Sequence, residues 1–176
     1  MSFSDEYLPS MPDTLRLSPF DLYVDPLLNL QDARLRALLA YWTEKRQGRA
    51  MPSRADVNPG EIVSHLPTVF LIDVRAPAVQ PSHFHVRLMG TALNDLFSAD
   101  YTGRTLDQGM SVQGGQMMAK VLGIICQLHR PLRLHGAMPL KHAKESIEVE
   151  AIIMPLSASG NIVEMAMGEV IKRASA

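Results

Sequence analysis

Apolar residues recur at two different spacings along the chain. Leu35, Leu38 and Trp42 repeat at the spacing of one helix face, which predicts a helix over about residues 31–47. A second run with this spacing predicts a longer helix over about residues 113–129. Elsewhere the apolar residues alternate with polar ones or form short β-branched runs, a pattern typical of strands.

Five segments have the composition of strands, because they are rich in branched and aromatic residues and bounded by turn residues. They are residues 68–74, 84–89, 132–138, 146–155 and 162–172. Short helices are predicted after Asn58, ending at Pro67, and after Gly90. Runs of strands around a helical block indicate an α+β fold with a five-stranded antiparallel sheet.

The first 28 residues carry four prolines among scattered apolar residues, which favours an extended arm over a helix. Phe20, Leu22 and Tyr23 are the residues expected to attach this arm to the rest of the chain. We therefore divide the chain into an extended arm, residues 1–28, and a single domain, residues 29–176, which is long and apolar enough to bury a core.

Composition narrows the function classes. Lys and Arg number 17 against 18 Asp and Glu, so there is no electrostatic case for a nucleic-acid surface. One cysteine, Cys126, excludes an intramolecular disulfide and a multi-cysteine metal site. The sequence has no signal peptide pattern and no apolar stretch of about 18 residues, so secretion and a membrane span are disfavoured. We expect a cytoplasmic protein.

Several short motifs follow one another over roughly residues 35–107. They are Tyr41-Trp42, Pro52-x-Arg54, Asp56-Val57-Asn58-Pro59, Leu66-Pro67, the strand 68–74, Arg87-Leu88-x-Gly90-Thr91 and Thr102-Gly103-Arg104-x-Leu106. Together with the order of elements, this set resembles the PAS superfamily, and within it the bacterial subgroup known as the fifth PAS family. The resemblance implies the PAS fold: a five-stranded antiparallel sheet with helices on one face, an N-terminal flanking helix and a small internal cavity.

The resemblance also implies a function. Members of the superfamily sense ligands, light, redox state or partner proteins, often as dimers through N-terminal helices. We therefore expect a stand-alone sensory module in signal transduction that binds a small molecule or a partner protein, acts through a separate signalling partner and forms a homodimer through helix 31–47. The candidate ligand-binding residues are His85, Arg87, Met89, Phe97, Met117, Val121, Arg133 and His135.

Two familiar cofactors of the superfamily are disfavoured, and the ligand itself stays unknown. Photosensing members that form a flavin adduct carry Asn-Cys-Arg-Phe on the helix after the second strand, whereas Gly90-Thr91-Ala92-Leu93-Asn94 has no cysteine. Heme-binding members use a histidine on the long central helix. The candidate here, His129, falls in the last turn, where a histidine commonly interacts with the helix dipole.

The candidates on the second strand have two interpretations each. Arg87 shares a strand face with His85 and could bind a carboxylate or phosphate of a ligand, or it could pair with Asp73 or Asp95. The ion pair is favoured because buried charges are usually paired. His85 and His83 would bind a metal only with a third ligand.

On the later strands, Arg133 and His135 could line the cavity, but a solvated strand face is the default expectation. Glu148 and Glu150 alternate on one strand face and are also expected to be solvated. Cys126 lies among apolar residues, which predicts a buried, unreactive thiol. A group of methionines predicts an adaptable core, although ordinary packing explains buried methionines equally well. They are Met117, Met118, Met138, Met154, Met165 and Met167.

Three functions are compatible with these patterns. The first is the ligand-binding sensor. The second is a ligand-free dimerisation or protein-interaction module in which the apolar face of helix 31–47 pairs with its copy, and a filled cavity would favour it. The third is a small enzyme that uses His85, Arg87 or His135 as acid, base or anion clamp. No nucleophile or metal motif is present, so we expect no enzymatic activity.

Overall fold

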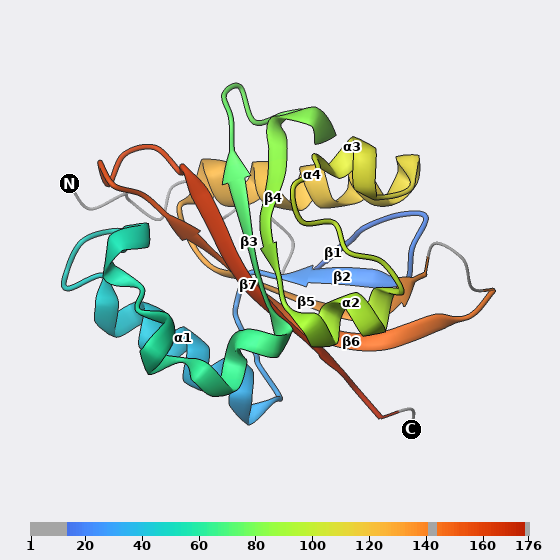
Figure 1. Ribbon diagram of the computed structural model, residues 1–176, viewed down its shortest axis with the longest axis horizontal. Coiled ribbons are helices and arrows are strands. Elements are labelled where there is room, and N and C mark those ends of the chain that lie inside the picture. Colours follow the sequence, from blue (N-terminus) through green and yellow to red (C-terminus); the bar gives the residue numbers. More distant parts are fainter. Residues whose placement is uncertain (1–13, 141–143, 175–176) are drawn as a thin grey trace.

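The computed structural model describes residues 14–140 and 144–174. Its centre is an antiparallel sheet of seven strands in the order β1-β2-β5-β6-β7-β3-β4 (Figure 1). The strands are β1 Leu15–Arg16, β2 Leu22–Asp25, β3 Val69–Val74, β4 Phe84–Met89, β5 Leu132–Pro139, β6 Ser146–Leu156 and β7 Met165–Lys172. The two longest pairings, β5 with β6 and β6 with β7, form the middle of the sheet.

Four α-helices and four short 3-10 helices complete the described chain. The α-helices are α1 Ala33–Lys45, α2 Thr91–Phe97, α3 Leu106–Gly109 and α4 Val112–Leu128, and the 3-10 helices are η2 Arg54–Asp56, η3 Pro59–Glu61, η4 Val63–Thr68 and η5 Pro81–His83. The long helices match the predicted ones, but the short helix predicted after Asn58 was wrong: two 3-10 helices stand in its place, and Pro67 lies inside the second. None of the helices described is both long and apolar enough to cross a bilayer.

The expected strand count of five was wrong. All five predicted strands exist, as β3 to β7, but the N-terminal segment adds a hairpin, β1 and β2, to the edge of β5. Two kinds of contact hold the hairpin to β5. The side chains of Leu22 and Val24 are fully buried, and the backbone N–H of Ala137 donates to the carbonyl of Asp21. The strand was not predicted because it has only four residues and prolines stand on both sides of it.

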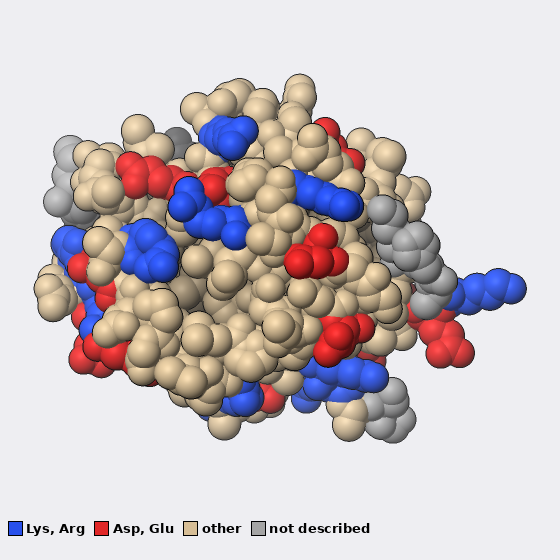
Figure 2. All heavy atoms as spheres, viewed as in Figure 1, with Lys and Arg blue, Asp and Glu red and all other residues tan. Residues whose placement is uncertain are grey.

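The sheet separates two apolar cores. On one face, α2, α3 and α4 enclose the larger core. Helix α1 lies on the other face (Figure 1). Its buried residues Leu35, Leu38 and Trp42 pack against β3, β6 and β7. Trp42 is deeply buried there, because only 3% of this residue is exposed. Basic and acidic side chains are interspersed on the face that Figure 2 draws.

Gly90 lies where two separate segments of the chain come into close contact. This residue connects β4 to α2 and touches the backbone at the end of η4. A Cβ atom here would collide with the carbonyl oxygens of Leu66 and Pro67. The position therefore requires glycine for close backbone approach, which fixes the start of α2 above the sheet.

Candidate ligand cavity

A cavity of about 290 Å³ lies within the larger core, between the sheet and α2 to α4. Strands β3, β4, β5 and β7 form its floor, and α2, α3, α4 and the loops beside α3 form its walls. The turn between β1 and β2 contributes Phe20. The lining residues are Phe20, Phe70, Ile72, Val86, Met89, Leu93, Phe97, Tyr101, Leu106, Met110, Ser111, Gln113, Gly114, Met117, Met118, Met138, Pro139, Leu140 and Val170.

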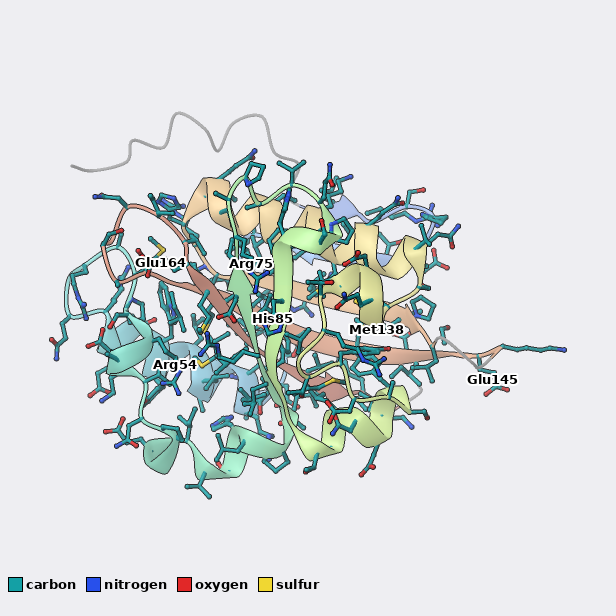
Figure 3. All side chains as sticks on the ribbon, turned by 45° about the horizontal axis from the view of Figure 1, so that its top comes forward. Arg54, Arg75, His85, Met138, Glu145 and Glu164 are labelled. Atoms are coloured by element: carbon teal, nitrogen blue, oxygen red, sulfur yellow. The ribbon has the colours of Figure 1, made fainter. Side chains whose placement is uncertain are left out.

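The lining is apolar and rich in two kinds of side chain. Five methionines contribute thioethers, among them Met138 on β5 (Figure 3), and four aromatic residues contribute rings. The polar groups are few: the hydroxyls of Tyr101 and Ser111 and the amide of Gln113. Among the lining residues that the structure describes, none carries a formal charge. Such a surface suits an apolar ligand held by a small number of hydrogen bonds.

Three of the eight candidate ligand residues line the cavity. They are Met89 on β4, Phe97 at the end of α2 and Met117 on α4. Val121 is fully buried on the same helix, one turn farther on, but outside the lining. The other four candidates lie on the opposite face of the sheet. Met89 has the parity of His85 but reaches the cavity face, because the register between β3 and β4 shifts at Arg87.

Arg87 and His85 converge on one carboxylate at the edge of the sheet. Nε of Arg87 donates to both oxygens of Asp73 at 3.0 and 3.1 Å, and Nδ1 of His85 lies 3.3 Å from Oδ2 of Asp73. This bears out the ion-pair interpretation of Arg87. His83, whose ring nitrogen Nδ1 accepts backbone N–H groups of its own loop, is occupied elsewhere. In the described ranges no three potential ligands cluster as a metal site would need.

Arg133 is the centre of a buried ionic network, so the expectation that Arg133 and Glu150 are solvated was wrong. Arg133 reaches Oε2 of Glu150 through Nε at 2.8 Å and Nη2 at 2.7 Å, and Oδ2 of Asp25 through Nη1 at 3.3 Å. The side chains of all three residues are at most 8% exposed. Glu148, by contrast, is exposed as predicted.

Glu150 also holds the start of α1. The backbone N–H of Asp32 donates to Oε1 at 2.8 Å, and that of Gln31 to Oε2 at 3.0 Å. Burial alone would raise the pKa of the Glu150 carboxyl, but these bonds and Arg133 outweigh it and hold the pKa below its ordinary value. The stabilisation is therefore present at neutral pH and lost as the pH falls through the folded-state pKa. The network ties β2, the sheet and α1 together.

His135 and Cys126 are not placed to act as nucleophile or base in the cavity. His135 stacks on Tyr23 with ring centroids 5.6 Å apart, and burial lowers the pKa of its imidazole. Burial also raises the pKa of the Cys126 thiol to about 11, which keeps it protonated at neutral pH. Cys126 was predicted to be buried and is only half-buried, but the raised pKa agrees with the predicted low reactivity of its thiol.

Sequence reasoning missed a second buried carboxylate, Glu169 on β7. It is fully buried, and its oxygens contact Nδ1 of His65 at 2.8 Å and the hydroxyl of Thr68 at 2.6 Å. Its partners lie about 100 residues earlier in the chain, so no local sequence pattern predicts these contacts. An acidic residue within the apolar run of a central strand was the one available signal.

Three solved structures show what this chain is similar to. The PAS domain of BvgS from Bordetella pertussis is 12% identical over 67% of this chain and 89% of that domain, with a TM-score of 0.43. A LOV protein from Rhodobacter sphaeroides is 12% identical over 66% of this chain and 67% of its own, with a TM-score of 0.45. The PAS domain of an HTR-like protein from Haloarcula marismortui is 8% identical, covers 65% and 91%, and gives 0.39.

No curated protein matches the sequence significantly. The sequence pattern of one family, described as PAS domain, matches residues 30–171. This match leaves out the β1–β2 hairpin but includes every other strand and all the α-helices. PAS domains are typically sensory and regulatory modules. The chain belongs to the PAS domain family.

Proposed function

We propose that this PAS domain senses a small, mostly apolar molecule that binds in the cavity between the sheet and α2 to α4. The observation that carries the proposal is the cavity of about 290 Å³ itself, with its adaptable methionine walls. An apolar void of this size destabilises a fold because its lining atoms lose packing contacts. A bound molecule restores those contacts, so binding stabilises the occupied form.

The rival proposal, a ligand-free dimerisation module, has less support. A filled interior would favour it, and the interior here is open. The apolar face of α1, Leu35, Leu38 and Trp42, packs against the sheet of its own chain. A homodimer through this helix would therefore use its outer face, and we keep that dimer, together with a separate signalling partner, as part of the proposal.

An enzymatic role has the weakest support. Two of the residues suggested for catalysis, His85 and Arg87, contact the carboxylate of Asp73 at the edge of the sheet, away from the cavity. The third, His135, stacks on Tyr23. We therefore propose a regulatory module whose output is a change in the chain itself, passed on through α1 and the network at Arg133.

Filling the cavity from its floor should abolish ligand capture. Val170 on β7 lines the cavity and is 6% exposed, so Val170→Phe directs a ring into the space that a ligand would occupy. Val79→Phe makes the same change at a residue that is 67% exposed. We expect native mass spectra of the wild type and Val79→Phe to contain a small molecule that is lost on denaturation, and Val170→Phe to lack it.

The same spectra count the subunits, which tests the homodimer separately. Equal retention of the molecule by Val170→Phe would place it outside the cavity and contradict the proposal. A wild-type protein with no bound molecule in native spectra, even after incubation with cell extract, would contradict it too.

A further inference from the structure

We infer that the ligand is an uncharged aromatic molecule about the size of two fused rings, with one hydrogen-bond-accepting group. This inference deepens the proposed function and depends on it. The size, the side chains and the charge of the cavity each limit the ligand independently.

The volume sets the size. An apolar cavity of roughly 150 Å³ is known to bind benzene. The cavity here is about 290 Å³, nearly twice that value. It therefore has room for two fused rings with a small substituent, but not for a larger multi-ring cofactor in its present shape.

The lining favours a ring over an aliphatic chain. Met89 contributes a thioether from β4 in the floor and Met117 one from α4 in the walls, and Phe70 and Phe97 contribute rings from the sheet and from α2. Thioether sulfurs make favourable contacts with aromatic rings, and aromatic pairs gain from edge-to-face or offset stacking. A planar aromatic ligand obtains both kinds of contact, whereas an alkyl chain obtains neither.

The described lining residues offer an ionised ligand no partner of opposite charge. They carry no charge, and the two arginines among the predicted ligand residues are used elsewhere: Arg87 binds Asp73, and Arg133 is enclosed by Glu150 and Asp25. An ion moved from water into such a site loses hydration without gaining a partner. A neutral ligand avoids this cost.

Two uncharged hydroxyl groups of the lining can donate a hydrogen bond to an acceptor on the ligand. The hydroxyl of Ser111 accepts the N–H of Gly114 at 3.1 Å and keeps its own proton for donation. The phenol of Tyr101 donates to no other described residue, and burial raises its pKa, so it stays protonated. A carbonyl or ether oxygen on the ligand satisfies such a donor, which accounts for the accepting group.

Two probes of nearly equal shape test this ligand class. 2-Acetonaphthone is a neutral naphthyl ketone, and 2-naphthoate is its anionic counterpart of almost the same size. Their dissociation constants are measured by isothermal titration calorimetry at neutral pH for the wild type, Val79→Phe and Val170→Phe. We expect the ketone to bind the wild type and Val79→Phe at least tenfold more tightly than the anion does, and Val170→Phe to lose ketone binding.

The two proposals fail in different ways. Equal or tighter binding of 2-naphthoate, abolished in Val170→Phe, would overturn the neutral ligand class and leave the sensory cavity standing. Binding of neither probe to the wild type would overturn the aromatic ligand class alone, because the native mass spectra test the cavity with any molecule. Ketone binding that survives in Val170→Phe would contradict the use of the cavity.

Discussion

Replacing Arg133 with Met is expected to lower the free energy of unfolding by about 3–5 kcal/mol, because removing one member of a buried ionic network leaves the others uncompensated. Here two carboxylates, Glu150 and Asp25, would stay buried without the guanidinium that binds both. Methionine fills a similar volume, so packing changes little and the lost charge dominates. Urea denaturation followed by circular dichroism gives the free energy directly.

Arg87→Met is the matched control for this substitution. Its ion pair with Asp73 lies at the surface, with 60% of the arginine side chain exposed, and such pairs contribute about 0–1 kcal/mol. We therefore expect a large loss at position 133 and a small one at position 87. Equal losses at the two positions, or a loss below about 1 kcal/mol for Arg133→Met, would contradict the role of the network.

Trp42→Ala is expected to lower the free energy of unfolding by about 3–5 kcal/mol through the cavity that it leaves under α1. The ring is 3% exposed and packs in the second core. Its Nε1 also donates to the carbonyl of Pro155 at 2.9 Å, and the truncation leaves this buried acceptor unpaired. Thermal and urea unfolding curves measure the loss.

Trp42→Phe separates the two contributions. Phenylalanine keeps most of the buried ring area but cannot donate to Pro155, so we expect a loss of about 1–3 kcal/mol, the cost of one unsatisfied buried acceptor. If Trp42→Ala were as stable as the wild type, α1 would not be anchored to the sheet in the way described. Losses of the same size for Ala and Phe would assign the whole effect to the hydrogen bond.

The sequence predicted most of the fold because its central elements carry strong local patterns. The five strands β3 to β7 and the helices α1 and α4 lie within a few residues of their predicted bounds. The hairpin was missed because its strands are two and four residues long and two prolines, Pro19 and Pro26, stand close to β2. Its edge pairing depends on β5, more than 100 residues later, which local propensity does not report.

The residues of the candidate site were predictable only where the apolar pattern determines which side chains face the core. Phe97 and Met117 follow from the inward faces of two helices, whereas Met89 reaches the cavity only because the register of β4 shifts at Arg87. Arg133 and Glu150 were not predictable, because alternation identifies two faces of a strand without saying that both are covered. The groups that Glu150 binds before α1, Gln31 and Asp32, precede it by 119 and 118 residues.

Labelling the methionine methyl groups with ¹³C and titrating with 2-acetonaphthone tests the central claim most directly. Of the nine methionines that the structure describes, five line the cavity and four lie in the second core on the far side of the sheet. The cavity set is Met89, Met110, Met117, Met118 and Met138, and the far set is Met51, Met154, Met165 and Met167. The account predicts that NMR shifts concentrate in the cavity set while the far set changes little. Shifts confined to the far set, or none at saturating probe, would contradict it.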